Sequence, residues 1–425
     1  MPTMTRFRQF IVIISFFASL NVFSAEPLSL EKALSIAMES NPELQASKAK
    51  WEAESSQIRS QYWLENPKVG FMRENNMTLM QQQMGPMNSV SVSQEVKFPV
   101  KYFLMGSAQS NKSEAMREEF RAKQFEIRQK IISSYYNLYS TSQIVSLLKA
   151  QKETLREIAR IAEARRATGK VPQQDEMKAH VEQTKLENEL LLAEQEQEEA
   201  QGKLNALLNQ DADLVLDLKE SISAPSIKEN LDQVSKEWLS NSPMVQKEIF
   251  TSQEADTKKT LARLSYAPDF MLSYRKAISN APTGAYAFAV EATIPLWFFA
   301  KQTAETSQAS SFATEAEKNL EKARRDSHAE LRAISKKVKA QENILKIYET
   351  SLIPQSLTTL NSSRASYQAG RTGFLELLDS ERSLYTVRVS YFQTLSQFVE
   401  NIAKLEALLG KTVSSLPLGD LNENK

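Results

Sequence analysis

The sequence predicts a mainly α-helical fold with a small membrane β part, built from two copies of one unit. The last helix-forming stretch, Tyr367 to Gly410, runs for about forty residues with apolar residues at seven-residue spacing in several rows. A similar stretch lies 201 positions earlier. Before each of these stretches, two segments change to the two-residue period of β-strands. These observations predict long packed helices joined to four strands per chain.

The repeat is visible in short matched segments. Residues 167–170 precede the similar residues 368–371 by 201 positions, and 203–208 precede 404–409 by the same number. Pro42 and Pro67 match Pro243 and Pro268 at this offset. The predicted divisions are a signal peptide at 1–25, a first unit at 26–225, a second unit at 226–410 and a C-terminal tail at 411–425.

The N-terminus has the pattern of a cleaved signal peptide. Arg6 and Arg8 precede an apolar run at 10–20, and a peptidase site is expected after Ser24 or Ala25. A short membrane anchor is the alternative, but about eleven apolar residues are too few for a bilayer of ~30 Å. The chain contains no cysteine, which excludes a cysteine lipid anchor, disulfides and thiolate metal sites.

Charge and hydropathy exclude a nucleic-acid-binding protein and a helical membrane protein. The 52 basic and 52 acidic residues balance, and without Arg6 and Arg8 the numbers become 50 and 52, so no basic field for nucleic acid exists. After residue 25 no apolar run of 18 residues occurs, so no helical membrane span is expected.

Residues 26–40 predict a short amphipathic helix, which Asn41-Pro42 separates from a second helix that ends near Leu64. Hairpins are then expected at about 68–98 and 269–294, since apolar and polar residues alternate there over segments of about ten residues. A soluble hairpin would also alternate. The residues predicted to face lipid are Val90, Val92, Val96, Phe270, Leu272, Tyr286, Phe288 and Val290.

A long helix is predicted after each hairpin. Heptad spacing runs from about Lys101 to Ala167 and from about Lys301 to Ala369, with a kink expected at Pro354. At 1.5 Å per residue, such a helix is a rod of about 100 Å, which exceeds the thickness of a bilayer and must stand in water.

The four predicted strands imply that several chains assemble into one closed barrel. An open four-stranded sheet cannot sit in lipid because its edges would leave backbone groups unpaired. Two chains would give eight strands and a filled barrel, whereas three would give twelve and some interior room.

The chain resembles the TolC family of outer-membrane efflux proteins over nearly its whole mature length. The resemblance rests on ordered motifs: Leu28-Ser29-Leu30-Glu31-Lys32-Ala33-Leu34, Asn41-Pro42-Glu43-Leu44, Phe98-Pro99, Ile294-Pro295-Leu296, Leu352-Ile353-Pro354-Gln355, Tyr367-Gln368-Ala369-Gly370, and the segment from Leu375 to Leu384.

This resemblance implies a homotrimer with a twelve-stranded outer-membrane β-barrel continuous with an α-helical periplasmic barrel, as in Gram-negative bacteria. It implies a passive conduit for small solutes, with a periplasmic adaptor and an inner-membrane pump, such as an RND transporter, as partners. The short chain is most similar to the heavy-metal, Czc/Cus-type branch. The alternatives are a type I secretion duct and an extracytoplasmic coiled-coil scaffold without a channel.

Two sites are expected at the helix-hairpin tips. Adaptor docking is assigned to Thr168, Gly169, Lys170, Val171, Gly370, Arg371, Thr372 and Gly373. A periplasmic aperture is assigned to Glu376 and Asp379, three residues apart on one helix face, with Arg371 or Arg382 pairing with them. Simple capping of the helix N-terminus by these acidic residues is the alternative.

No enzyme, cofactor or metal site is predicted. The two histidines, His180 and His328, lack a second ligand at i+3 or i+4, so each is expected on a solvated helix surface. The five methionines of the first hairpin, at 72, 77, 80, 84 and 87, would suit Cu(I), but a tolerant loop is the favoured interpretation.

Overall fold

The structure, a computed structural model, describes residues 27–74, 87–167, 173–218, 222–229, 238, 241–279 and 285–417. The predicted signal peptide lies outside the described residues, as do most of the Met-rich segment and the first set of tip residues, Thr168, Gly169, Lys170 and Val171.

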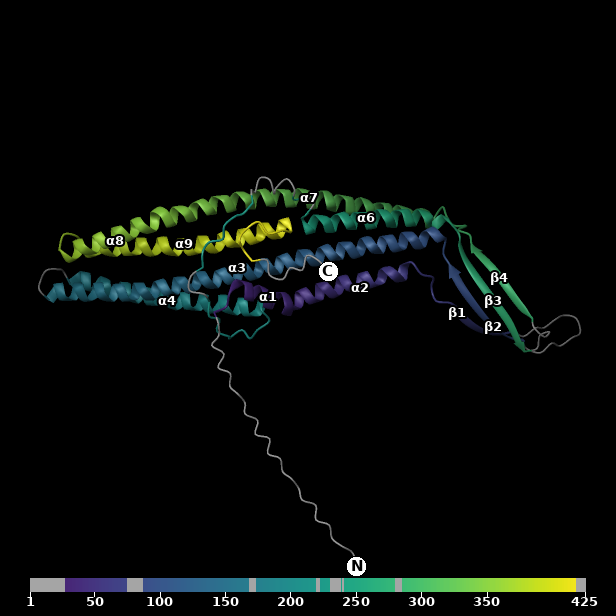
Figure 1. The fold of residues 1–425 in the computed structure, drawn as a ribbon, viewed down its shortest axis with the longest axis horizontal. Coiled ribbons are helices and arrows are strands. Elements are labelled where there is room, and N and C mark those ends of the chain that lie inside the picture. The colour runs from purple at the N-terminus through teal and green to yellow at the C-terminus, as the bar shows by residue number, and fades with distance from the viewer. Residues whose placement is uncertain are drawn as a thin grey trace, which may run out of the picture.

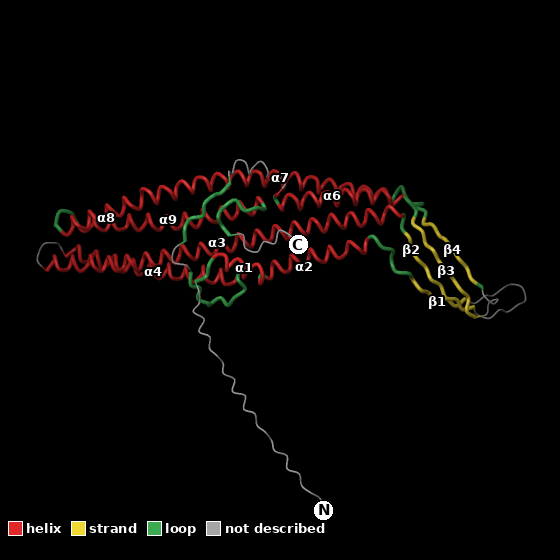
Figure 2. The backbone as a smooth tube through the Cα atoms, in the orientation of Figure 1, coloured by secondary structure: helices red, strands yellow, loops and turns green. Residues whose placement is uncertain are grey.

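The chain forms an elongated helical body with a four-stranded sheet at one end and the turn between its last two helices at the other (Figures 1 and 2). The elements are α1 (Leu30–Ser40), α2 (Pro42–Gln61), β1 (Lys68–Glu74), β2 (Met87–Val96), α3 (Pro99–Ala167), α4 (Gln173–Leu207), α6 (Pro243–Arg263), the 3₁₀ turn η1 (Leu264–Tyr266), β3 (Asp269–Ser279), β4 (Tyr286–Thr293), α7 (Lys301–Ile347), the π-helical turn η2 (Tyr348–Leu352), α8 (Ile353–Gln368) and α9 (Phe374–Leu409).

Corresponding elements of the two halves start at the offset seen in the sequence. The first residues of α2 and α6, of β1 and β3, and of α4 and α9 each differ by 201. In the first half a single helix, α3, fills the place that α7, η2 and α8 fill in the second half (Figure 1). The domain limits 26–225 and 226–410 stay a prediction.

Local chemistry explains where the helices start and break. Asn41 caps α2 by accepting from the backbone N–H of Glu43 at 2.9 Å, and Pro42 occupies the first helical position, where its missing N–H costs nothing. Where a kink was predicted, a π turn directly precedes Pro354, and in it the N–H of Ile353 bonds the carbonyl of Tyr348 five residues back. The wider turn accommodates the proline ring inside a continuous rod.

The wide apolar stripe predicted for the last helix is buried. The stripe consists of three rows of apolar residues at seven-residue spacing, which include Leu377, Leu378 and Leu395. Each row contains buried residues of α9. The helix begins at Phe374, so Tyr367 belongs to α8 and not to the last helix. Gly410 ends α9 at φ 65°, a left-handed conformation in which an added Cβ would lie 2.4 Å from the Asn241 carbonyl oxygen.

The sheet has the order β1-β2-β3-β4, and all neighbours are antiparallel. Its register places Val92 between Val69 and Tyr274, and pairs Tyr274 with Phe288, so these apolar residues share one face. All eight residues predicted to face lipid, Val90, Val92, Val96, Phe270, Leu272, Tyr286, Phe288 and Val290, lie on this face.

The opposite face of the sheet carries small and polar residues. Ser91 pairs with Gly70 and Arg275, and Ser93 pairs with Ser273, which pairs with Ala289. The strands are less uniform than the ten residues predicted, because β1 has 7 residues and β4 has 8. Among the described strands, β2 and β3 have neighbours on both sides, whereas β1 and β4 each have one neighbour and form the edges of the sheet in a single chain.

None of the described helices is both long enough and apolar enough to span a membrane.

Candidate functional site

The turn between α8 and α9 forms one tip of the helical body, at the end far from the sheet (Figure 1). Gly370 adopts φ 74°, and its N–H bonds the carbonyl of Tyr367 at 2.9 Å, while the N–H of Arg371 bonds the carbonyl of Ser366 at 2.9 Å. These two bonds make a Schellman motif, in which a residue without Cβ is favoured. The backbone of Gly370 therefore terminates α8.

An arginine ties this turn to the other helical hairpin. Arg165, near the end of α3, donates to the carbonyl of Tyr367 at 2.6 Å, and its guanidinium lies 5.0 Å from the centre of the Tyr367 ring. That ring packs against Phe374, with ring centres 6.1 Å apart. A Cβ at Gly370 would come within 2.8 Å of the Arg165 guanidinium, so a side chain there would disturb this contact as well.

Ion pairs also link the two hairpins. Arg382 of α9 donates through Nε to Glu182 of α4 at 2.8 Å, and Arg364 of α8 pairs with Glu157 of α3. In the single chain Arg382 therefore pairs with Glu182, and its pairing with Glu376 or Asp379 around an aperture stays a prediction.

Glu376 and Asp379 are exposed and lie in the first two turns of α9. With Arg382 and Glu182 they line a groove of about 740 Å³ between α4 and α9. The groove also has an apolar part, formed by Met177, Val181 and Leu375, which are 55%, 53% and 58% exposed. The lining also includes Lys178 and Lys185, so acidic and basic side chains flank an exposed apolar strip, an arrangement that suits a protein partner.

A buried carboxyl close to this groove was not predicted from the sequence. Glu381 is only 5% exposed, and its Oε1 has no hydrogen-bond partner. Burial and, to a smaller extent, the nearby Glu182 carboxylate raise the pKa of Glu381 to about 7, against the opposing effect of Arg382. Heptad spacing offered a signal, since Glu381 lies four residues after Leu377 and three before Leu384, on the buried stripe of α9.

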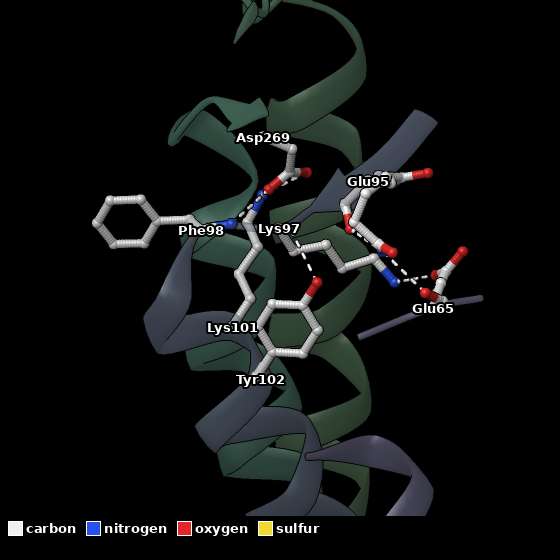
Figure 3. A network of polar contacts seen from close by, with 8 residues as sticks. Glu65, Glu95, Lys97, Phe98, Lys101, Tyr102 and Asp269 are labelled. Carbon is white, nitrogen blue, oxygen red and sulfur yellow. Dashed lines mark hydrogen bonds and ion pairs between the residues drawn. The ribbon is translucent and has the colours of Figure 1, made fainter. Parts of the chain in front are cut away.

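A separate polar network joins the sheet to the helices (Figure 3). Lys101, at the start of α3, donates to both carboxylate oxygens of Asp269 at 2.8 and 2.9 Å and to the carbonyl of Ala267 at 3.2 Å. Asp269 also accepts from the backbone N–H of Phe98 at 2.8 Å. This network fixes the turn after β2 against the first residue of β3.

Both histidines are solvent-exposed, as predicted. His328 lies 5.8 Å from the Trp238 ring, measured between ring centres. Within the described ranges, no group of three or more His, Cys, Asp or Glu side chains is placed to hold a metal ion. Of the methionines considered for Cu(I), those at 77, 80 and 84 lie outside the described residues.

Solved structures establish the fold. CusC superposes with a TM-score of 0.77 at 18% identity, over 90% of this chain and 92% of that one. The outer-membrane channel OprN gives 0.78 at 16% identity, over 90% and 89%. The outer membrane protein VceC from Vibrio cholerae gives 0.77 at 15% identity, over 90% and 96%.

Sequence comparison agrees with the fold. The cobalt-zinc-cadmium resistance protein CzcC of Cupriavidus metallidurans is 24% identical over 395 residues, which cover 91% of each chain. The sequence model of the family described as "Outer membrane efflux protein" matches residues 33–210 and again 234–411, two stretches that begin 201 residues apart. Since these matches cover most of the chain, the protein belongs to the outer membrane efflux protein family.

Proposed function

We propose that this protein is the outer-membrane duct of a tripartite efflux system, a homotrimer that conducts small solutes passively from the periplasm to the exterior. Three copies of the four-stranded sheet close into one twelve-stranded barrel, and three helical bodies continue it as a tunnel in the periplasm. Membership in the outer membrane efflux protein family supports the compartment and the transport role.

The observation that carries this proposal is the two-sided sheet. One face is mostly apolar, with Phe288 66% and Val290 59% exposed and with Gln94 and Lys276 as polar exceptions, while the other face carries Ser91, Ser273 and Ala289. A soluble hairpin would bury its apolar face against a core. An apolar outer face, a small and polar inner face, and two open edges fit a barrel wall between lipid and water.

The substrate class is proposed from the relatives. CzcC is described as a cobalt-zinc-cadmium resistance protein, and its similarity extends over nearly the whole chain. We favour metal ions over drugs on this basis. The exposed carboxylates Glu376 and Asp379 at the tips would place six negative charges around the trimer axis, which attracts divalent cations and repels anions.

Adaptor docking is proposed at the tips. The groove between α4 and α9 offers an apolar strip, formed by Met177, Val181 and Leu375, between charged rims. Such a groove fits the apolar face of a partner helix. Leu375→Glu should therefore reduce efflux while trimers form normally, because Leu375 is exposed and outside the core. Full efflux by this variant would count against docking in the groove.

The decisive experiment combines location, assembly and the polarity of the sheet. The protein should fractionate with the outer membrane and run as a trimer in mild detergent.

Phe288→Arg should block assembly, because arginine on the lipid side of a barrel costs about 2–4 kcal/mol near the midplane. Ala289→Arg is the matched control on the adjacent residue, which the register places on the opposite face, across from Ser273. A monomer in the soluble periplasmic fraction would contradict the proposal.

A further inference from the structure

The last helix, α9, carries two buried glutamates whose surroundings differ. Glu406 is 0% exposed, and its carboxylate accepts hydrogen bonds from the Arg128 guanidinium and from two backbone N–H groups. Glu381 is 5% exposed, and no described residue donates a hydrogen bond to its Oε1. A charged carboxylate that is buried without such donors is strongly destabilised, so this position favours the neutral form of Glu381.

Glu381 lies where the two helical hairpins meet. It belongs to the N-terminal part of α9, which runs far from the sheet (Figure 1). Leu377, four residues earlier, and Leu384, three residues later, are both buried on the same stripe of the helix. The next residue, Arg382, crosses to Glu182 of α4 and donates to it through Nε at 2.8 Å. A change of charge at Glu381 therefore acts at the contact between α9 and α4.

Charged groups of both helices act on this carboxyl. The Glu182 carboxylate of α4 disfavours a second negative charge, whereas Arg382 of α9 favours one. Both hydrogen bonds from Arg382 go to Oε1 of Glu182. The ammonium group of Lys185, also on α4, lies 4.0 Å from Oε2 of the same carboxylate. An ionised Glu381 would therefore have to compete with Glu182 for these cations.

The surrounding helices add further charges. Asp379 of α9 and Glu189 of α4 also attract Arg382. From the two other helices of the hairpins, Arg364 of α8 pairs with Glu157 of α3. Each of these arginines already has a carboxylate partner, which is why burial outweighs attraction at Glu381.

We propose that Glu381 is a proton-dependent lock on the tips of the duct: its neutral form keeps α9 packed against α4, and its ionised form favours separation of the two helices. Separation relieves the buried charge because it brings the carboxylate into water. The ion pair across the same contact resists separation only weakly, since the Arg382 side chain is 52% exposed. This regulation rests on the proposed function, because it acts on the tips of the proposed duct.

Burial sets the direction of the response. The pKa of Glu381 is about 7 while it is buried, and exposure to water returns it to the ordinary 4.5. The lock is therefore complete below the ordinary pKa and is lost as the pH rises through about 7. For these two values, linkage gives a ratio of separated to closed tips that rises about tenfold from pH 6 to pH 8.

The test measures how often the contact opens in the full chain in mild detergent, with one introduced cysteine as the reporter, since the chain has no natural cysteine. Leu378→Cys places a thiol in the groove between α4 and α9 at a position that is 6% exposed. Leu375→Cys, at a position 58% exposed in the same groove, calibrates the reactivity of an accessible thiol at each pH. The labelling rate at 378 divided by that at 375 should rise about tenfold from pH 6 to pH 8. With Glu381→Gln added, the ratio should change less than about twofold, because an amide does not titrate in this range.

Two controls separate the lock from other causes. Leu405→Cys places the thiol at the body end of α9, where Leu405 is 1% exposed, and its labelling relative to Leu375→Cys should stay constant. Glu400→Gln removes an exposed carboxyl from the same helix and should leave the full response at 378. A response that is absent, that persists in Glu381→Gln, or that Leu405→Cys shows equally would overturn the inference.

The labelling experiment requires neither trimers nor transport, so its outcome is independent of the proposed function. Trimers that export solutes but show no pH response at 378 would overturn the lock alone. A pH response that depends on Glu381, in a chain that forms no trimers, would support Glu381 as the lock on the hairpin contact while the proposed function fails.

Discussion

A buried ion pair near the middle of the body supports the clearest prediction about stability. Arg128 of α3 and Glu406 of α9 are 1% and 0% exposed and approach to 2.6 Å. The other carboxylate oxygen of Glu406 accepts from the backbone N–H groups of Val413 and Ser414 at 2.8 and 2.9 Å, and from the Ser414 hydroxyl at 2.7 Å. Together these contacts hold the segment after α9 against the helices.

Replacing Glu406 with Gln keeps the shape and removes the charge. One amide oxygen cannot serve both the Arg128 guanidinium and the two backbone N–H groups, and the amide NH₂ must face a donor on one side. Breaking a buried pair from one side costs about 3–5 kcal/mol, because the remaining charge stays buried. Arg128 would retain the Pro417 carbonyl, at 2.9 Å from Nη2, so we expect the lower end of that range.

The assay is equilibrium unfolding in detergent, followed by hydrogen exchange of the Val413 and Ser414 amides. Glu406→Gln should lower the free energy of unfolding by about 3 kcal/mol and release both amides to fast exchange. Glu330→Gln is the control, since Glu330 pairs with Lys404 on α9 at 3.1 Å but both side chains are more than 40% exposed. Its effect should stay under about 1 kcal/mol. Unchanged stability and protected amides in Glu406→Gln would refute the reasoning.

Three further predictions concern single positions. Because the pKa of Glu381 is raised, the contribution of this residue to stability is complete below the ordinary pKa of 4.5 and is lost as the pH rises through about 7. The Glu381→Gln variant should therefore be as stable as the unmodified protein at pH 4.5 and more stable at pH 8, by at most about 3 kcal/mol. Unfolding curves at the two pH values measure this difference. Gly410→Ala should lower the melting temperature, because a Cβ would press on the Asn241 carbonyl and occupy a left-handed φ; an unchanged melting temperature would show that the turn relaxes freely. Glu376→Gln with Asp379→Asn should weaken cation selectivity in planar-bilayer recordings, and an unchanged selectivity would leave both residues as helix caps.

Local periodicity was enough to predict most of the fold. The alternation of Val90 and Val92 with serines predicted one apolar sheet face, and the register confirmed it. The seven-residue rows of the last helix predicted burial on a wide stripe, because a helix fixes which residues share a face. Pro354 predicted a disturbance in the rod, because proline cannot donate a backbone bond in any helix.

The long-range polar contacts could not be predicted in the same way. Glu182 and Arg382 are 200 positions apart, and each is an ordinary charged residue on a helix surface when considered alone. Periodicity gives the face of a helix but not the neighbour that the face meets, nor the axial level at which two helices align. The same limit applies to Arg128 and Glu406, whose burial depends on a third segment folding over them.

The two ends of α9 are held by different sets of contacts, so the free energy needed to move each end differs. Its C-terminal half lies in the large core of the body with Phe398 and Leu405, whereas its N-terminal turns lie in a separate, smaller core with Phe374 and Leu377. At the tips, the hairpins are linked partly by an ion pair between Glu182 and an arginine that is 52% exposed, and such pairs contribute about 0–1 kcal/mol. In the body, separating α9 from α3 would instead expose buried apolar side chains of the large core to water, which costs about 25 cal/mol for each Å² of apolar surface. Rearranging the hairpins relative to each other is therefore less costly at the tips than in the body, and the tips are where the chain carries its exposed acidic residues.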